Sequence, residues 1–174
     1  MEQEPLGEEA RTQHYVELWK QTITVQQHFN DISWRIRGLA LTVMTFALGT
    51  AAVTSRHNIA VDFFSISLKF SALVLWLSLT LWLAFFFVDK SWYHRLLIGS
   101  VKHGEVLEEE LRRTLPKAGL TRQISASSPS PLPSYFHESW PYRQAIHSTG
   151  KLRIFYWTGT AVLTVFALGI QFGS

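Results

Sequence analysis

The apolar run from residue 70 to residue 88 constrains this sequence more than any other feature. Its nineteen residues, FSALVLWLSLTLWLAFFFV, include no charged side chain. A helix needs about 20 apolar residues to cross the hydrocarbon core of a bilayer, whereas a buried helix of a soluble protein usually keeps a polar face. Aromatic residues gather at the end of the run, and Asp89 and Lys90 follow them, a pattern typical of a membrane boundary. The run therefore predicts a transmembrane helix.

Two further uncharged runs predict two more spans. One covers residues 38–55, and the other covers residues 154–174 near the C-terminus. A short turn at residues 57–62 is expected between the first two spans. The predicted transmembrane helices are 38–55, 63–88 and 151–174, which makes the chain an all-α integral membrane protein.

Helical sequence continues beyond the first two spans, so that they form a long hairpin with extensions. Residues 1–37 comprise an N-terminal tail and an amphipathic helix that leads into the first span. Residues 89–115 extend the second span as far as Pro116. Residues 116–150 then form a Pro/Ser-rich linker with an aromatic juxtamembrane segment, which leads to the third span.

Apolar residues on both extensions recur at spacings of three and four, the repeat of helices that pack along a seam. We therefore expect the extensions to form a stalk, by packing together and against other copies of the chain. The pairs Glu108–Arg112 and Glu109–Arg113 are expected to form ion pairs along the second extension. The predicted seam residues are Tyr15, Leu18, Val25, Phe29, Ile32, Ile36, Tyr93, Leu97, Leu107 and Leu111.

Small residues follow one face of the first span at spacings of four and three. Small side chains let membrane helices approach closely, and threonine hydroxyl groups can form hydrogen bonds across such a contact. The face has two interpretations: it packs against another helix, or it lines a pore. Its members are Gly38, Thr42, Thr45, Gly49 and Ala52.

The distribution of Lys and Arg predicts the orientation in the membrane. Residues 1–37 contain four of them, the segment between the first two spans contains Arg56 alone, and residues 89–153 contain ten. Positive charge marks the cytoplasmic side, so we expect a cytoplasmic N-terminus, an external C-terminus and a location in the cell inner membrane. Lys69, near the outer end of the second span, is expected to extend its ammonium group to the interface.

Motifs that carry catalytic or metal chemistry are not found in the sequence. It contains no cysteine, no phosphate-binding glycine loop, no nucleophile elbow and no HExxH. We expect no enzyme activity, no catalytic, cofactor or metal site, and no nucleic-acid partner. A basic cluster after the second extension is either a solvated face or a contact for an anionic lipid or a nucleotide. It consists of Arg112, Arg113, Lys117 and Arg122.

The order of these elements resembles that of a known class of bacterial membrane proteins. An amphipathic helix that enters a span, a short turn, and a second span that continues as a charged helix look like SLATT-type proteins. Residues 92–105, WYHRLLIGSVKHGE, more specifically resemble the RipA-like small inner-membrane proteins. The resemblance covers residues 10–115, whereas the third span and the linker depart from it. It implies an octamer and, for SLATT proteins, a role as pore-forming effectors in nucleotide-triggered defence.

Two functions follow as expectations. The first is a homo-oligomeric channel or pore-forming effector gated from the cytoplasm, with a cytoplasmic sensor or partner protein. The second is a non-enzymatic scaffold that organises partner proteins or lipids in the bilayer. The position of the small-residue face of the first span distinguishes them, because a pore needs this face on a water-filled axis.

Overall fold

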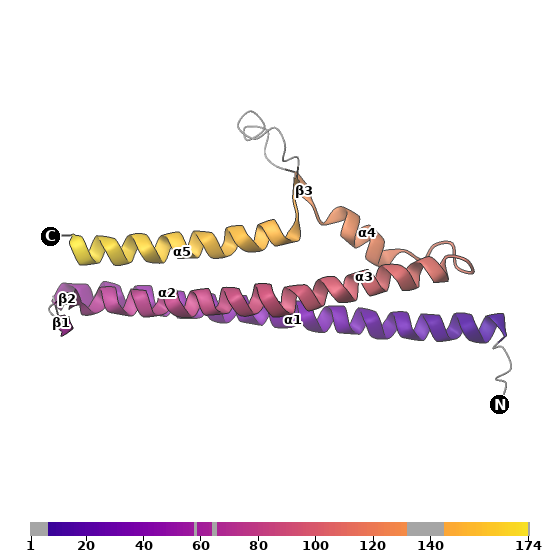
Figure 1. The fold of residues 1–174 in the computed structure, drawn as a ribbon, viewed down its shortest axis with the longest axis horizontal. Coiled ribbons are helices and arrows are strands. Elements are labelled where there is room, and N and C mark those ends of the chain that lie inside the picture. The colour runs from indigo at the N-terminus through magenta and orange to yellow at the C-terminus, as the bar shows by residue number, and fades with distance from the viewer. Residues whose placement is uncertain (1–6, 58, 64–65, 132–144, 174) are drawn as a thin grey trace. The chain divides into compact units, whose positions relative to one another are not determined.

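The computed structural model describes residues 7–57, 59–63, 66–131 and 145–173 of the chain. These residues are predominantly helical, as expected, and include two small antiparallel two-stranded sheets (Figure 1). The helices are α1 (Glu8–Thr54), α2 (Phe70–Val88), α3 (His94–Leu111), α4 (Leu120–Ser127) and α5 (Ser148–Phe172). The strands are β1 (Ala60–Phe63), β2 (Ile66–Lys69), β3 (Ser130–Pro131) and β4 (Ala145–Ile146). A 3-10 turn (Ser55–His57) follows α1, and a π-helical turn (Asp89–Tyr93) joins α2 to α3.

The chain divides into two compact units. Unit 1 comprises Met1–Ile32 and Tyr93–Ser148, and unit 2 comprises Ser33–Trp92 and Thr149–Ser174. The 47-residue helix α1 contributes its first half to unit 1 and its second half to unit 2. No proline interrupts α1, which allows the amphipathic segment and the first apolar run to form one helix.

Unit 2 is a bundle of three helices: the second half of α1, all of α2 and nearly all of α5. Small residues of α1 pack against large residues of the other two helices, which brings the helices close together. The buried core lies between them, and Trp82 and Leu75 are its largest α2 members. The core consists of Ala40, Ala47, Ala51, Leu75, Trp82, Leu152, Tyr156, Leu163 and Ala167.

The link between α1 and α2 corrects the predicted start of the second helix. We expected helix from Phe63, but the helix begins at Phe70, and strands β1 and β2 pair with Ala60 opposite Lys69 and Phe63 opposite Ile66. The sequence Ile-Ser-Leu-Lys over β2 alternates apolar and polar residues, which favours a strand. The apolar run 70–88 coincides with α2.

In unit 1, the first half of α1 packs with α3 and α4. Of the predicted seam, Leu107 and Leu111 of α3 are buried, whereas Val25 of α1 is 43% exposed. Thr22, which falls at the same spacing between Leu18 and Val25, is buried. Val25 is therefore the exposed member of the predicted stripe on this half of α1.

The segment predicted as a Pro/Ser-rich linker, residues 116–150, contains regular structure. Leu120–Ser127 form helix α4, and β3 pairs with β4. The cause is a long-range contact to the start of α4, described below. Residues 132–144, which hold most of the predicted aromatic segment, lie outside the described residues.

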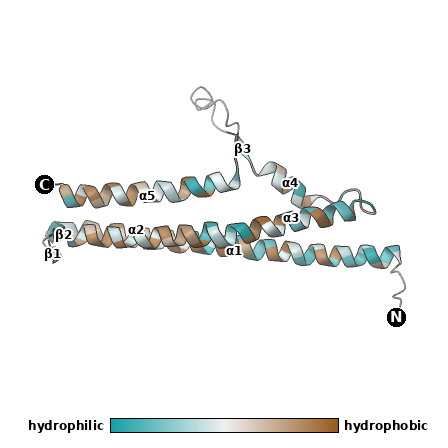
Figure 2. Ribbon diagram, in the orientation of Figure 1, coloured by the Kyte–Doolittle hydropathy of each residue, from teal (hydrophilic) through white to brown (hydrophobic). Residues whose placement is uncertain are grey.

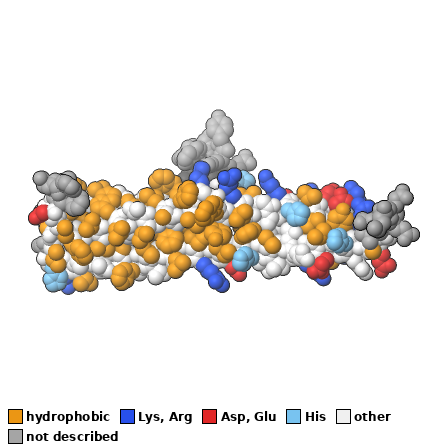
Figure 3. Space-filling view, turned by 60° about the horizontal axis from the view of Figure 1, so that its bottom comes forward, with side chains coloured by type: hydrophobic (Ala, Val, Ile, Leu, Met, Phe, Trp, Pro, Cys, Tyr) orange, Lys and Arg blue, Asp and Glu red, His pale blue; other side chains and the backbone are white. Residues whose placement is uncertain are grey.

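Three helical stretches are long and apolar enough to cross a membrane: Glu8–His57, Phe70–Leu111 and Ser148–Phe172. Apolar residues are dense along α2, whereas the first half of α1 is mostly hydrophilic (Figure 2). At most 28% of each apolar window is buried inside the chain. Hydrophobic side chains cover much of the visible surface over the apolar helices (Figure 3).

Candidate functional site

A buried polar cluster joins the three helices of unit 2 at one end. Asp89, at the C-terminal cap of α2, has a fully buried side chain. Arg37 of α1 donates from Nε to Asp89 Oδ2 at 2.8 Å and from Nη2 to Asp89 Oδ1 at 3.4 Å. The hydroxyl of Tyr156 on α5 donates to Asp89 Oδ2 at 3.2 Å. One carboxylate thus ties all three helices together.

The position of Asp89 at the end of α2 lets side chains of both α1 and α5 reach its carboxylate. Asp89 opens the π-helical turn Asp89–Tyr93, and such turns are often found at functional sites. The Arg37 side chain is 24% exposed and also lies over the ring of Trp34 at 5.9 Å. A charged pair on the edge of solvent avoids part of the desolvation cost of a fully buried pair.

Aromatic packing continues from this cluster into the core. The Trp82 indole N–H donates to the backbone oxygen of Tyr156 at 2.9 Å, and the two rings meet edge to face at 5.3 Å. Gly159 leaves room for this indole, since a Cβ there would collide with Trp82. The glycine is therefore required for the close approach of α5 to α2.

A second polar tie closes the opposite end of unit 2. The Lys69 ammonium group donates to the carbonyl oxygen of Gly173 at 2.8 Å, and the Lys69 backbone N–H donates to Gln171 Oε1 at 3.1 Å. Gln171 donates in turn to the Ser67 carbonyl oxygen at 3.1 Å. Lys69 therefore caps the C-terminal end of α5, where a cation is favoured, in addition to the interfacial role that we expected.

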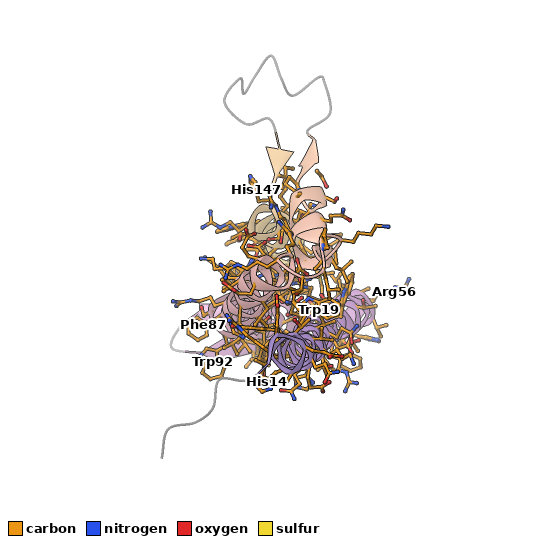
Figure 4. The ribbon with its side chains drawn as sticks, turned by 90° about the vertical axis from the view of Figure 1, so that its right-hand side faces the viewer. His14, Trp19, Arg56, Phe87, Trp92 and His147 are labelled. Atoms are coloured by element: carbon orange, nitrogen blue, oxygen red, sulfur yellow. The ribbon has the colours of Figure 1, made fainter. Side chains whose placement is uncertain are left out.

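Unit 1 has its own buried carboxylate, Glu108 of α3. It accepts hydrogen bonds from the backbone N–H groups of Thr121 at 2.6 Å and Arg122 at 3.2 Å, and from the Trp19 indole at 3.1 Å. Burial raises the pKa of Glu108, but these hydrogen bonds outweigh burial, so the pKa lies below its ordinary value. Trp19 lies among the helices rather than at their edge (Figure 4). Glu108 thus supplies the N-terminal cap that orders α4.

Gly104 and Gln26 allow α3 to lie close to α1 and α4 near Glu108. Gly104 of α3 is buried, and a Cβ there would come within 2.7 Å of Gln26 Nε2 and 3.1 Å of Thr121 Oγ1. Gln26 of α1 donates to the Ser100 carbonyl oxygen at 3.0 Å. The first half of α1, α3 and α4 therefore meet through polar contacts, and not through apolar contacts alone.

The expected ion pairs of α3 form with different partners. We predicted Glu108–Arg112 and Glu109–Arg113, but the structure pairs Arg112 with Glu109 at 3.3 Å and Arg113 with Glu110 at 3.0 Å. The reason is that Glu108 turns inward to cap α4. Each basic residue pairs instead with the acidic residue three positions before it.

The predicted basic cluster is only partly available to a ligand. Arg112 and Arg113 hold acidic partners, and Arg112 Nε also donates to the Ala118 carbonyl oxygen at 2.7 Å. Lys117 and Arg122 are exposed. Arg113 borders a small pocket that includes acidic as well as basic residues, which does not favour an anion. The pocket is lined by Glu8, Arg11, Thr12, Tyr15, Glu110, Leu111, Arg113 and Thr114.

The small-residue face of the first span lies on the outside of unit 2. Gly38, Thr42, Thr45, Gly49 and Ala52 are all exposed. A Cβ added at Gly38 or Gly49 would meet no atom within 4 Å. Next to this face is a shallow groove lined by Phe46, Gly49, Thr50, Val53 and Thr54.

The remaining seam residues are divided between the two units. Tyr15, Leu18, Phe29 and Ile32 of α1 and Leu97 of α3 are half-buried in unit 1, as is Tyr93 of the π-helical turn. Ile36 is buried in unit 2.

Asp89, Tyr156 and Glu108 are the site residues that sequence reasoning missed. Asp89 and Arg37 were visible as opposite charges next to two uncharged runs, at the ends that an antiparallel hairpin brings together. That arrangement was a usable signal for the ion pair. Tyr156 and Glu108 gave no comparable signal, because neither of them pairs with a residue of opposite charge.

Both buried carboxylates join helices of the chain. Within the described ranges, no group of three or more His, Asp or Glu residues lies close enough to hold a metal ion. Both buried carboxylates are occupied by donors of the chain itself. Comparison with known protein families, curated proteins and solved structures gave no match.

Acidification should release α4 from Glu108. Because the pKa of Glu108 is lower in the folded chain, its stabilising contribution is present above the ordinary value of 4.5 and is lost as the pH falls through the folded pKa. We expect peptides covering residues 119–127 to lose protection from hydrogen–deuterium exchange below about pH 4.5. Glu108→Gln should lose about tenfold or more of that protection at pH 7, because a hydrogen bond to a charged group contributes about 1.5–3 kcal/mol.

Glu109→Gln provides the matched control for this measurement. Glu109 lies next to Glu108, but its side chain is 71% exposed. Its replacement should leave the exchange of residues 119–127 unchanged. Equal protection in wild type and Glu108→Gln across this pH range would show that Glu108 does not hold α4.

Proposed function

We propose that this chain is a subunit of a homo-oligomeric membrane channel whose conduit lies between copies, next to the small-residue face of α1. The observation that carries the proposal is the exposure of that face. Ala40, Ala47 and Ala51 of the same helix pack inside the chain, whereas Gly38, Thr42, Thr45, Gly49 and Ala52 point away from α2 and α5. Faces of this composition allow close approach of another helix.

Membrane insertion is supported by the surface of unit 2. Large apolar residues on all three of its helices face outward, among them Phe46, Leu77 and Phe166 at 76%, 63% and 53% exposure. Exposed apolar surface of this extent is costly in water and suits the hydrocarbon core of a bilayer. From the distribution of Lys and Arg we infer a cytoplasmic location for the N-terminus and residues 89–153, an external location for the short β1–β2 link, and insertion into the cell inner membrane.

A conduit through one copy alone is not compatible with the packing of unit 2. Leu75, Trp82 and Leu163 fill the space between the helices and are almost completely buried. The buried carboxylate of Asp89 pairs with Arg37, so these two charges neutralise each other. An ion path would therefore run between copies, next to the exposed residues Thr42 and Thr45.

The cytoplasmic unit gives such a channel a place for control. Unit 1 includes half of α1, the helix that carries the small-residue face in unit 2. A partner that binds α3 or α4 and shifts the first half of α1 could therefore act on the conduit through one continuous helix. Such a role agrees with the resemblance to pore-forming SLATT-type proteins and remains part of this proposal.

One observation favours the scaffold as a second candidate. The Thr42 hydroxyl donates to the Gly38 carbonyl oxygen at 2.9 Å, so it is satisfied within its own helix. A face whose hydroxyl groups are satisfied in this way can pack dry against a neighbouring copy. In that case the oligomer would hold partner proteins or lipids without conducting ions.

Enlarging the small-residue face should weaken the assembly and change its conductance. For Gly49→Leu we expect the concentration at which the purified oligomer dissociates to rise at least tenfold, which corresponds to about 1.4 kcal/mol. A leucine at this position prevents close approach of a second helix. Native mass spectrometry gives the mass of the particle, and ion flux into liposomes measures conductance.

Gly169→Leu is the control, because Gly169 of α5 is also exposed and a Cβ there has open space. It should keep both the wild-type mass and the wild-type flux. An unchanged mass and flux for Gly49→Leu would contradict the proposal. A stable oligomer of wild-type protein that passes no ions, alone or with cytoplasmic extract, would favour the scaffold.

A further inference from the structure

We propose that unit 2 binds the headgroups of anionic phospholipids through a collar of tryptophan and basic side chains. Each of its three helical segments contributes one tryptophan and one cation to this collar. This inference rests on the membrane insertion proposed above and adds a class of lipid partner to it. The collar consists of Trp34 and Arg35, Lys90 and Trp92, and Arg153 and Trp157.

The polar cluster around Asp89 holds the three parts of the collar at one level. Arg35 lies two residues before Arg37 on α1, and Lys90 follows Asp89 directly. Arg153 lies three residues before Tyr156 on α5. Since the side chains of Arg37, Asp89 and Tyr156 are hydrogen-bonded together, residues within one turn of each lie at the same end of the bundle.

The three tryptophans are exposed, although Ser33 next to Trp34 and Tyr156 next to Trp157 are buried. Trp34, Trp92 and Trp157 are 64%, 62% and 62% exposed. Phe87 and Trp92 extend from the periphery of the helices in the end-on view (Figure 4). Exposed indole rings are costly in water but favourable at the level of lipid headgroups, where the ring is in an apolar layer and its N–H meets polar groups.

The charge of the collar is not balanced by acidic side chains of unit 2. The only acidic residues in its sequence are Asp62 and Asp89. Asp89 is buried and paired with Arg37, and Asp62 lies on β1, beyond the other end of the apolar helices. Arg35 and Arg153 are exposed, and the Lys90 ammonium group lies 5.2 Å from the Phe86 ring centroid. Three cations therefore face the region where lipid phosphates would lie.

The collar is a better candidate for lipid binding than the predicted basic cluster of α3 and α4. Arg112 and Arg113 of that cluster already have acidic partners, and no exposed tryptophan of the described chain lies next to them in sequence. A phosphate group with an attached acyl chain matches both components of the collar, because the cations attract the phosphate and the indoles contact the glycerol and upper acyl region. A soluble phosphate would match the cations alone.

The test is a titration of the purified full-length protein with defined lipids, followed by native mass spectrometry. Phosphatidylglycerol and phosphatidylcholine are added separately, and the ratio of their binding constants gives the headgroup preference. We expect wild type to prefer phosphatidylglycerol. The variant Arg35→Gln/Lys90→Gln/Arg153→Gln should lose about a hundredfold of this preference, since each cation near an anionic surface is worth about fivefold. Lysine at positions 35 and 153 should largely preserve it.

A matched variant removes three exposed charges from unit 1: Lys102→Gln/Lys117→Gln/Arg122→Gln. It should retain the wild-type preference. Equal losses in the two triple variants, or no loss in the collar variant, would overturn the proposal. So would glycerol phosphate binding as tightly as phosphatidylglycerol, because the site would then recognise a soluble anion. Failure of membrane insertion is detected separately, when alkaline carbonate releases the protein from membranes.

Discussion

Replacing Arg37 with methionine should lower the free energy of unfolding in detergent by about 3–5 kcal/mol, the usual cost of leaving a buried charge unpaired. Asp89 is fully buried, and Arg37 holds both of its carboxylate oxygens. Tyr156→Phe should cost less, about 1.5–3 kcal/mol, because it removes one hydrogen bond to a charged group. Thermal and denaturant unfolding followed by circular dichroism measures these differences.

Two further variants distinguish the loss of the ion pair from a general effect of substitutions in α1. Arg37→Met/Asp89→Leu replaces both partners with apolar side chains, and it should recover most of the loss. Arg35→Met changes an exposed arginine two residues away and should change the stability by less than about 0.5 kcal/mol. If Arg37→Met unfolds like wild type, Asp89 is not held by this pair.

Trp82→Ala should destabilise unit 2 by about 3–5 kcal/mol, the range for truncating a large buried aromatic residue. The Trp82 side chain is 2% exposed, packs on Gly159 and contacts the rings of Phe155 and Tyr156. Its removal opens a cavity and eliminates the hydrogen bond to the Tyr156 carbonyl oxygen. The same unfolding measurements report this loss.

Trp157→Ala is the control, since Trp157 is adjacent to Tyr156 but 62% exposed. In detergent it should leave the stability nearly unchanged, although it removes the same number of atoms as Trp82→Ala. Similar stabilities for Trp82→Ala and wild type would show that the three helices of unit 2 do not pack around this indole.

Polar contacts join the helices of unit 2 at both ends of the bundle. Asp89 joins the three helices at one end, and Lys69 with Gln171 joins β2 to the end of α5 at the other. Large residues pack between these ties against small residues of α1. A bundle secured in this way can present the opposite face of α1 to another copy without losing its own packing.

The main elements of the fold were predictable because they depend on neighbours in sequence. The apolar run 70–88 coincides with α2, and the third helix, Ser148–Phe172, covers most of the predicted span 151–174. The amphipathic helix within residues 1–37 was expected to lead into the first span, and both segments lie on the single helix α1. Strand β2 was missed because its four residues were read as part of the apolar run that follows them.

The sequence by itself determined which segments are helical and apolar, but the tertiary structure decided which side chains meet. Asp89 was read as a marker of the membrane boundary, yet its buried carboxylate pairs with Arg37 and accepts a hydrogen bond from Tyr156. Glu108 was assigned to a local ion pair, but it caps a helix that begins twelve residues later. Local sequence sets where a helix begins and how apolar its faces are, whereas rotation and register depend on packing against distant segments. Such packing also left the small-residue face of α1 exposed and buried the alanine face beside it.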